Sequence, residues 1–412
     1  MEQNLPVTFV IFGATGDLAE KKLFPALFQL FHKGLIVEGR FRIVGFARRP
    51  FTNEAFRDLV ARSLTAQGVA RTADFETFLS TISYHQGYFD QIEAYHSLLP
   101  VLAEIDEEFD VCSHKLFHLS LSPFFYEKVL ELIDRSGLNI SCVDSAGKTK
   151  ILLEKPIGID SKSGKRINKL LERIFHEDHI YRIDHYLMKA AVWDLLTMHF
   201  TEQQLRDVWS HQYVDHVEIH LFEKLDIQGR GTFYDHVGAL RDVGQNHVLQ
   251  MLALIAMEKP ARSDAAAFRK ERKNLLAHLR VTSLFRKLPN MIRGQYEGYE
   301  VEEGVESGSQ TETFFSVETM ISNSRWKGVS FILSAGKALA ESRVEAVMYF
   351  KNGDRMEFCV QPDPHVTFLV GGKKQTISWK EIHEQATHGL ELGASPEGYE
   401  KVYHDALLGN QI

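Results

Sequence analysis

Apolar and polar positions follow one pattern in the first half of this chain and a different pattern in the second. The first half alternates short, almost fully apolar runs with longer segments in which apolar residues recur every three or four positions. The apolar runs are residues 7–12, 42–46, 117–121 and 151–154, and the helix-like segments are residues 17–32, 53–66, 124–136 and 160–175. This alternation predicts a doubly wound parallel sheet of the Rossmann type.

From about residue 185 the apolar residues follow a period of two. Residues 216–221 alternate between His or Glu and Val, Ile or Leu, which is typical of a half-buried antiparallel strand. Two long helical segments, 238–257 and 263–279, precede the strand-like runs 314–321, 331–335, 344–350, 356–361 and 366–370. We therefore expect a Rossmann domain over residues 1–184 and an α+β domain with a large, mostly antiparallel sheet over residues 185–412.

Composition narrows the class of protein. The 412 residues carry a net charge of −8, which argues against a nucleic-acid or anionic-membrane partner but allows a small anionic substrate. The first residues lack the basic region of a signal peptide, and the longest apolar run is too short to cross a bilayer. The three cysteines have neither disulfide-framework nor metal-ligand spacing. We expect a cytoplasmic protein that binds no metal.

The first candidate site follows the first predicted strand. Gly13 and Gly16 allow a sharp turn whose backbone can approach a pyrophosphate at the amino end of the next helix. The spacing G-x-x-G-x-x-A departs from the usual G-x-G-x-x-G, so the position of the turn in a βαβ unit supports this hypothesis more than the motif does. The alternative is a helix cap that binds nothing.

The second predicted strand ends in Arg48 and Arg49. Enzymes that use NAD usually carry an acid there for the ribose 2′-hydroxyl, whereas arginines suit a 2′-phosphate. This position favours NADP over NAD, the alternative being a pair of solvated arginines.

Three further segments, 154–156, 181–189 and 238–247, are unusually rich in polar groups. With them the chain resembles the glucose-6-phosphate dehydrogenase family. The resemblance is carried by Gly13-Ala14-Thr15-Gly16-Asp17-Leu18-Ala19, Glu154-Lys155-Pro156, Arg182-Ile183-Asp184-His185-Tyr186-Leu187, Gly229-Arg230-Gly231 and Gln245-Asn246-His247. It implies NADP-dependent oxidation of D-glucose 6-phosphate to 6-phosphogluconolactone, the first step of the oxidative pentose phosphate pathway, by a homodimer or homotetramer.

The resemblance also implies roles for individual residues. Oxidation of a sugar C1 hydroxyl requires a base for its proton, and a histidine held by a carboxylate suits that task; the family match assigns these roles to His247 and Asp184. The implied substrate-binding residues are Lys155, His185, Tyr186, Lys189, Glu223, Asp242, Lys337 and Gln361. The implied cofactor-binding residues are Gly13, Thr15, Gly16, Asp17, Leu18, Lys22, Arg48 and Lys155.

Several positions depart from the family pattern. Met188 replaces a glycine beside the expected phosphate site, and Ser334 and Ser342 replace cationic residues, with Arg343 next to the second. We therefore hypothesise weakened phosphate binding. Two alternatives stay open: a related sugar or sugar-phosphate dehydrogenase, and a non-catalytic NADP(H)-binding regulatory protein. The family segment matching residues 405–411 usually continues for several dozen residues, so we expect a compact variant or a lost carboxyl terminus.

Overall fold

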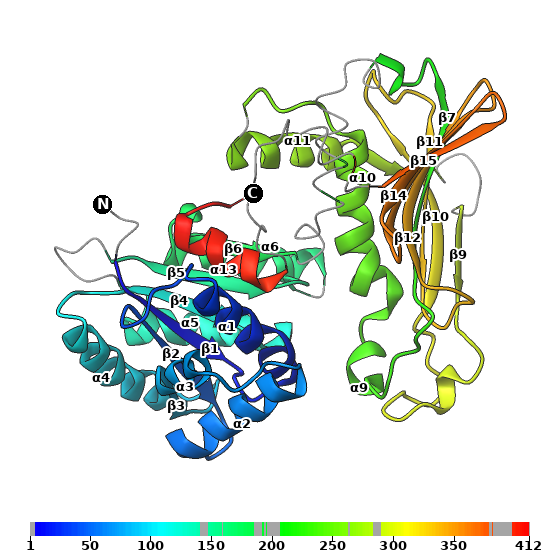
Figure 1. The fold of residues 1–412 in the computed structure, drawn as a ribbon. Coiled ribbons are helices and arrows are strands. Elements are labelled where there is room, and N and C mark those ends of the chain that lie inside the picture. The colour runs from blue at the N-terminus through cyan, green and yellow to red at the C-terminus, as the bar shows by residue number, and fades with distance from the viewer. Residues whose placement is uncertain are drawn as a thin grey trace. The chain divides into compact units, whose positions relative to one another are not determined.

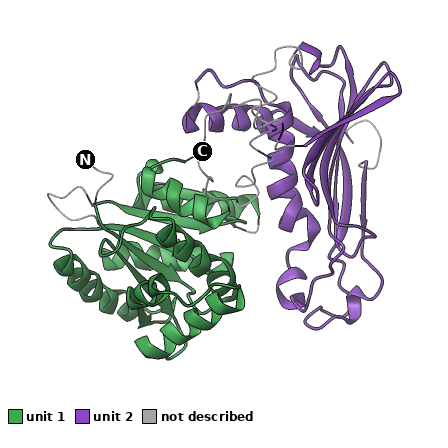
Figure 2. Cartoon of the chain, viewed as in Figure 1, with its two compact units in different colours: residues 1–188, 394–411 green, residues 189–393, 412 purple. Residues whose placement is uncertain are grey.

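The computed structural model describes residues 5–140, 147–158, 160–184, 192, 195, 207–262, 264–282, 290–378, 381 and 398–411. The chain forms two compact units, Met1–Met188 with Ala394–Gln411 and Lys189–Gly393 with Ile412 (Figure 2).

The first unit is built on a parallel six-stranded sheet (Figure 1). Its strands are β1 (Val7–Phe12), β2 (Phe41–Ala47), β3 (Ile82–Gln86), β4 (His114–Leu119), β5 (Thr149–Glu154) and β6 (Ile180–Ile183), in the order β3-β2-β1-β4-β5-β6. The helical segments include η2 (Ala19–Leu23), α1 (Phe24–His32), α2 (Asn53–Ala66), α3 (Ala73–Ser80), α4 (Ile92–Glu108), α5 (Tyr126–Ser136) and α6 (Ser161–Ile174). The prediction of a Rossmann sheet is confirmed.

Both faces of this sheet are buried, which explains the uninterrupted apolar runs of its strands. In β1, Phe9 and Ile11 pack into one hydrophobic core with residues of α1, α2 and α3. Val10 and Phe12 pack into a second core with residues of α4, α5 and α6.

The last helix, α13 (Tyr399–Leu408), also belongs to the first unit. Val402, Tyr403 and Ala406 lie in the same core as Phe9, and Figure 1 shows α13 in red beside α1. The sequence boundary at residue 184 assigned this helix to the second domain. In the structure its apolar face instead covers the parallel sheet.

The second unit is a nine-stranded sheet with helices along one face (Figure 1). The path β15-β14-β13-β12-β7-β11-β10-β8 is antiparallel except where β7 and β11 run parallel, and β9 pairs with β10. The strands are β7 (Val214–Phe222), β8 (Leu279–Val281), β9 (Met291–Gly294), β10 (Phe314–Ile321), β11 (Ser330–Gly336), β12 (Arg343–Phe350), β13 (Arg355–Gln361), β14 (His365–Val370) and β15 (Lys373–Ser378). The helical segments include α9 (Gly231–Tyr234), η6 (Leu240–Val248), α10 (Leu249–Ala256) and α11 (Ala265–Ala277). The predicted α+β domain is confirmed, and Val217, Ile219 and Leu221 are buried as their alternation indicated.

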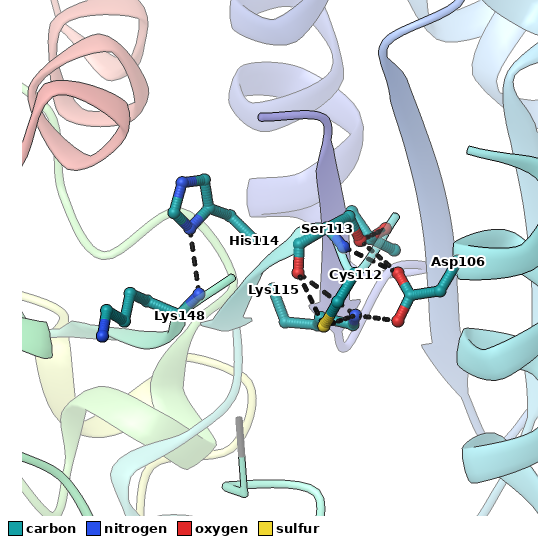
Figure 3. Close-up of polar contacts among 7 residues, drawn as sticks. Asp106, Cys112, Ser113, His114, Lys115 and Lys148 are labelled. Carbon is teal, nitrogen blue, oxygen red and sulfur yellow. Dashed lines mark hydrogen bonds and ion pairs between the residues drawn. The ribbon is translucent and has the colours of Figure 1, made fainter. Parts of the chain in front are cut away.

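A buried ion pair lies at the amino end of β4 (Figure 3). The Lys115 ammonium pairs with the Asp106 carboxylate and donates to the Ser113 carbonyl at 3.1 Å. Asp106 also accepts the Ser113 backbone N–H and hydroxyl at 2.9 and 2.8 Å. Burial lowers the pKa of Lys115, and the adjacent Asp106 carboxylate opposes that shift. The pair therefore places a desolvated charge at the amino end of β4.

We expect Asp106→Asn to lower the free energy of unfolding by about 2–3 kcal/mol, because it leaves the Lys115 ammonium buried without its counter-charge. Denaturant titration measures this loss. The matched control is Glu127→Gln, which breaks the exposed pair with Arg166 (3.3 Å) and should cost at most about 0.5 kcal/mol. Equal losses in the two variants would contradict the prediction.

The cysteines differ from the sequence-based expectation. Cys112 is disulfide-bonded, whereas Cys359 is a buried free thiol. The spacing indicated no disulfide framework, and the bond at Cys112 was not predicted, because spacing along the chain does not reveal which thiols meet in the fold.

No helix in the described part of the chain has both the length and the apolar character needed to cross a membrane.

Candidate active site

The turn after β1 is built around Gly13. Its φ is +83°, and its N–H donates to the Phe46 carbonyl of β2 at 2.8 Å. A Cβ at this position would lie 2.2 Å from the Ser120 carbonyl oxygen, which follows β4. Both the left-handed backbone and the close approach therefore require glycine.

A cavity of about 420 Å³ opens beside this turn. It lies at the carboxyl ends of β1, β2 and β4, where the strand order reverses, which is the usual ligand position in an open α/β sheet. The cavity is lined by Gly13, Thr15, Gly16, Ala47, Arg48, Arg49, Tyr88, Phe89, Asp90, Ser120, Leu121, Ser122 and Phe125. The predicted residues Gly13, Thr15, Gly16 and Arg48 are thus brought together. Asp17, Leu18 and Lys22 follow on the start of the next helix, where Asp17 pairs with Lys21 at 2.8 Å.

Two arginines stand at the end of β2, and the structure distinguishes them. The Tyr84 hydroxyl donates to the carbonyls of Ala47 and Arg49, and burial raises the pKa of Tyr84 to about 12. Arg49 also donates from Nη1 to the Thr15 carbonyl at 3.4 Å. Both arginines are exposed and line the cavity, and Arg49 in addition supports the glycine turn.

Lys155 and Asp184 lie side by side at the carboxyl ends of two neighbouring strands. The last residue of β5, Glu154, pairs with Ile183 of β6, so the residues that follow them are adjacent. Lys155 Nζ donates to Asp184 Oδ2 at 3.0 Å, and Asp184 is only 2% exposed. The Lys155–Pro156 peptide bond is cis.

In the second unit, three predicted substrate residues form one cluster. Lys337 Nζ lies 2.5 Å from Glu223 Oε2 and 3.7 Å from Asp242 Oδ2. The ammonium also sits 5.6 Å from the centre of the Tyr234 ring, and Lys337 is 4% exposed. The strand ends of β7 and β11 bring Glu223 and Lys337 together, because Phe222 is opposite Gly336 in the parallel pair.

Asp242 and His247 belong to η6, a π-helix over Leu240–Val248. A π-helix bonds residue i to residue i+5, so residues five apart lie one turn apart, and such segments often occur at functional sites. His247 is 8% exposed. The Glu312 carboxylate accepts the Leu240 N–H at 3.1 Å, which holds the amino end of η6.

Comparison with known proteins shows which family has this sequence and fold. The chain matches the family model "Glucose-6-phosphate dehydrogenase, NAD binding domain" over residues 10–194 and "Glucose-6-phosphate dehydrogenase, C-terminal domain" over residues 196–412. The chain belongs to the glucose-6-phosphate dehydrogenase family. Among its relatives, the glucose-6-phosphate 1-dehydrogenase of Borreliella burgdorferi is 35% identical over 97% of this chain and 86% of the relative. That of Bacillus subtilis is 32% identical over 99% and 87%.

Solved structures of the glucose-6-phosphate dehydrogenase family agree in fold. A glucose-6-phosphate dehydrogenase in complex with its substrate glucose 6-phosphate superposes with a TM-score of 0.85, at 31% identity, over 99% of this chain and 87% of that chain. The enzyme from Mycobacterium avium gives 0.79 at 28% identity, over 98% and 87%.

The remaining residues expected from the family resemblance are placed as follows. Gln361 lies at the end of β13, while His185, Tyr186, Met188 and Lys189 lie outside the described residues.

The positions that depart from the family pattern already have partners. The Ser334 and Ser316 hydroxyls are 2.8 Å apart, and Ser342 accepts the Lys224 N–H at 2.9 Å. Arg343 pairs with Glu345 on the sheet face shared with His220.

Several residues of these two sites lie outside the sequence motifs. Tyr234 lies against the Lys337 ammonium, Glu312 accepts the Leu240 N–H of η6, and Ser120 and Asp90 line the cavity. These residues reach the sites through tertiary contacts that the sequence does not reveal. Only the position of Ser120 just after a predicted strand could have indicated it as a site residue.

We expect Gly13→Ala to lower the free energy of unfolding by about 2–4 kcal/mol, since it adds both left-handed strain and overlap with the Ser120 carbonyl. Gly34→Ala is the matched control, because Gly34 has φ +69° and open space around it, and it should cost only about 1 kcal/mol. Calorimetric unfolding compares the two. Equal losses would show that the close approach at Gly13 is unimportant.

Proposed function

We propose that this chain oxidises D-glucose 6-phosphate to 6-phosphogluconolactone with NADP. One observation carries the proposal beyond family membership. Lys337 is held between the carboxylates of Glu223 and Asp242, in the second unit that also contains the His247 helix segment. Carboxylates and an ammonium arranged in this way can bind the hydroxyls of a polyol, which a plain alcohol dehydrogenase has no need to do.

His247 is the proposed general base. It accepts the proton of the C1 hydroxyl at a ring nitrogen as C1 is oxidised, a role that suits histidine because its pKa lies near the working pH. Asp184 is its proposed orienting partner. Asp184 lies in the first unit and His247 in the second, so their pairing is part of the proposal.

Sugar recognition is proposed for Glu223, Asp242, Lys337 and Gln361, and binding of the 6-phosphate for His185, Tyr186 and Lys189. Lys155 is proposed to contact both substrate and cofactor, and its ammonium is held at the strand ends by Asp184.

The residues of the 420 Å³ cavity fit NADP. The Gly13–Gly16 turn offers backbone N–H groups to a pyrophosphate, and Arg48 offers a guanidinium to a 2′-phosphate. When bound, this cofactor accepts the hydride that leaves C1. The protein's own part is to orient it and to exclude water from the reacting carbon.

A homodimer or homotetramer in the cytoplasm is the proposed working form. The cytoplasmic isoform of the potato enzyme is 33% identical over 99% of this chain and 83% of the relative, which supports this location.

The test is the absorbance of reduced nicotinamide with glucose 6-phosphate, glucose and 6-phosphogluconate, each supplied with NADP and with NAD. We expect turnover with glucose 6-phosphate and NADP. Turnover with glucose alone would favour a free-sugar dehydrogenase, and binding of NADP without turnover of any substrate would favour a regulatory protein.

A further inference from the structure

A half-buried carboxylate stands immediately before Lys155. Glu154 is the last residue of β5, and its side chain is 14% exposed. A carboxylate removed from water must be held by hydrogen-bond donors, or its desolvation is costly. His118, on the neighbouring strand β4, supplies one donor, with Nε2 2.9 Å from Glu154 Oε1.

His118 connects this carboxylate to the far end of the chain. Its Nδ1 lies 2.8 Å from the hydroxyl of Tyr403, and His118 is itself 1% exposed. Burial, followed by the Glu154 charge, raises the pKa of Tyr403 well above its ordinary value, so the hydroxyl keeps its proton. Because the Glu154 carboxylate can only accept, a neutral His118 ring leaves Nδ1 as the acceptor of the Tyr403 hydroxyl. Nε2 then carries the hydrogen that His118 donates to Glu154.

Helix α13 reaches Glu154 a second time. Tyr399 lies four residues before Tyr403, on the same helix face, and burial followed by the charge of nearby Glu154 raises the pKa of Tyr399. The Glu154 carbonyl accepts the Tyr126 hydroxyl at 2.9 Å. His118 and Tyr126 therefore bind Glu154 directly, and Tyr403 reaches it through His118.

The helix is firmly docked where it makes these contacts. Tyr403 packs edge-on against Phe9 with ring centres 5.4 Å apart. Lys150 Nζ donates to the Ala406 carbonyl at 2.6 Å, and the Gln411 amide donates to the Glu177 and Ile180 carbonyls at 2.8 and 3.1 Å. The carboxyl-terminal segment is thus attached to β5, to β6 and to the 3-10 turn before β6.

We propose that Tyr403 is a positioning residue for Lys155. Through His118 it holds Glu154, and Glu154 in turn sets the course of the chain at the next residue, so that the Lys155 ammonium meets Asp184 at 3.0 Å. Without the hydroxyl, Glu154 loses one member of its hydrogen-bond chain and the Lys155 turn gains freedom. The inference rests on the proposed role of Lys155 in binding substrate and cofactor.

Tyr403→Phe tests this, because it removes one hydroxyl and keeps the ring against Phe9. We expect kcat/KM for glucose 6-phosphate to fall 3- to 10-fold and the Kd for NADP, from titration calorimetry, to rise 2- to 5-fold. Thr8→Val is the matched control: it deletes a buried hydroxyl 2.8 Å from Ser113 Oγ, near the amino ends of β1 and β4, whereas Glu154 ends β5. It should lower Tm by a similar few degrees and leave both kinetic and binding values unchanged.

A double-mutant cycle with Lys155→Met separates positioning from a purely structural role. On the Lys155→Met background, Tyr403→Phe should change kcat/KM by less than 2-fold. An equal fold loss on both backgrounds, or no loss in Tyr403→Phe alone, would overturn the proposal. Absence of turnover by the unsubstituted enzyme would instead refute the proposed function, and the calorimetric comparison would still test Tyr403.

Discussion

His247→Asn is expected to lower kcat by about 10³-fold, the contribution typical of a well-placed general base. Asparagine approximates the size and polarity of the ring but cannot accept the proton of the C1 hydroxyl. The Kd for NADP should stay within 2-fold of that of the unsubstituted enzyme, because the cavity at β1, β2 and β4 contains no residue of η6. Steady-state kinetics and titration calorimetry measure the two quantities.

His236→Asn is the matched control for this prediction. His236 is exposed and lies in the segment just before η6, close to His247 along the chain. It has no role in the proposed chemistry. Its kcat should remain within 2-fold of the original value. A loss below 10-fold for His247→Asn would remove His247 from the role of base, whatever the family resemblance implies.

Local patterns were sufficient for most of the fold. The helix Asn53–Ala66 and the strand Phe314–Ile321 coincide with the predicted ranges, because each has clear periodicity and a polar boundary. Strands β3, β6, β8, β9 and β15 and helices α3 and α4 were not predicted. β3 is half-buried at an edge of its sheet, and β15 is largely exposed, so neither produces a strong apolar signal.

Long-range packing was beyond the reach of these patterns. Helix α13 follows the second unit in sequence, yet it buries Tyr403 against Phe9 in the first. The periodicity of α13 predicts an amphipathic helix but does not indicate which sheet its apolar face will cover. The sequence likewise suggested a single helix over residues 238–257, whereas the chain forms a π-helix before α10.

The site residues also divide into those that sequence patterns indicated and those that only the tertiary structure reveals. Motifs led to Gly13, Gly16 and Arg48, which the structure gathers around one cavity, and the resemblance led to Glu223, Asp242 and Lys337, which it gathers around one ammonium. Glu312 accepts the Leu240 N–H at the start of η6 although it lies far from η6 along the chain. A residue of this kind has no local sequence signature.

The two arginines at the end of β2 allow a sharper statement about the cofactor. Arg49 is engaged with the Thr15 carbonyl, and the Tyr84 hydroxyl holds its main chain. Its loss should disturb the glycine turn and weaken both NAD and NADP. Arg48 is exposed on the cavity wall, so its loss should affect only the ligand that carries an additional phosphate.

Arg48→Ala is therefore expected to raise the Kd for NADP by about 10- to 30-fold, the lower part of the range for a charge-assisted hydrogen bond, because solvent screens an exposed group. The Kd for NAD should change by less than 2-fold. Arg48→Lys should give an intermediate value for NADP, since a lysine keeps the charge but not the bidentate geometry. Arg49→Ala should weaken both cofactors by a similar factor. Parallel titrations of the three variants with both nucleotides distinguish these outcomes, and an equal loss of NAD and NADP affinity in Arg48→Ala would show that Arg48 supports the turn and does not select the phosphate.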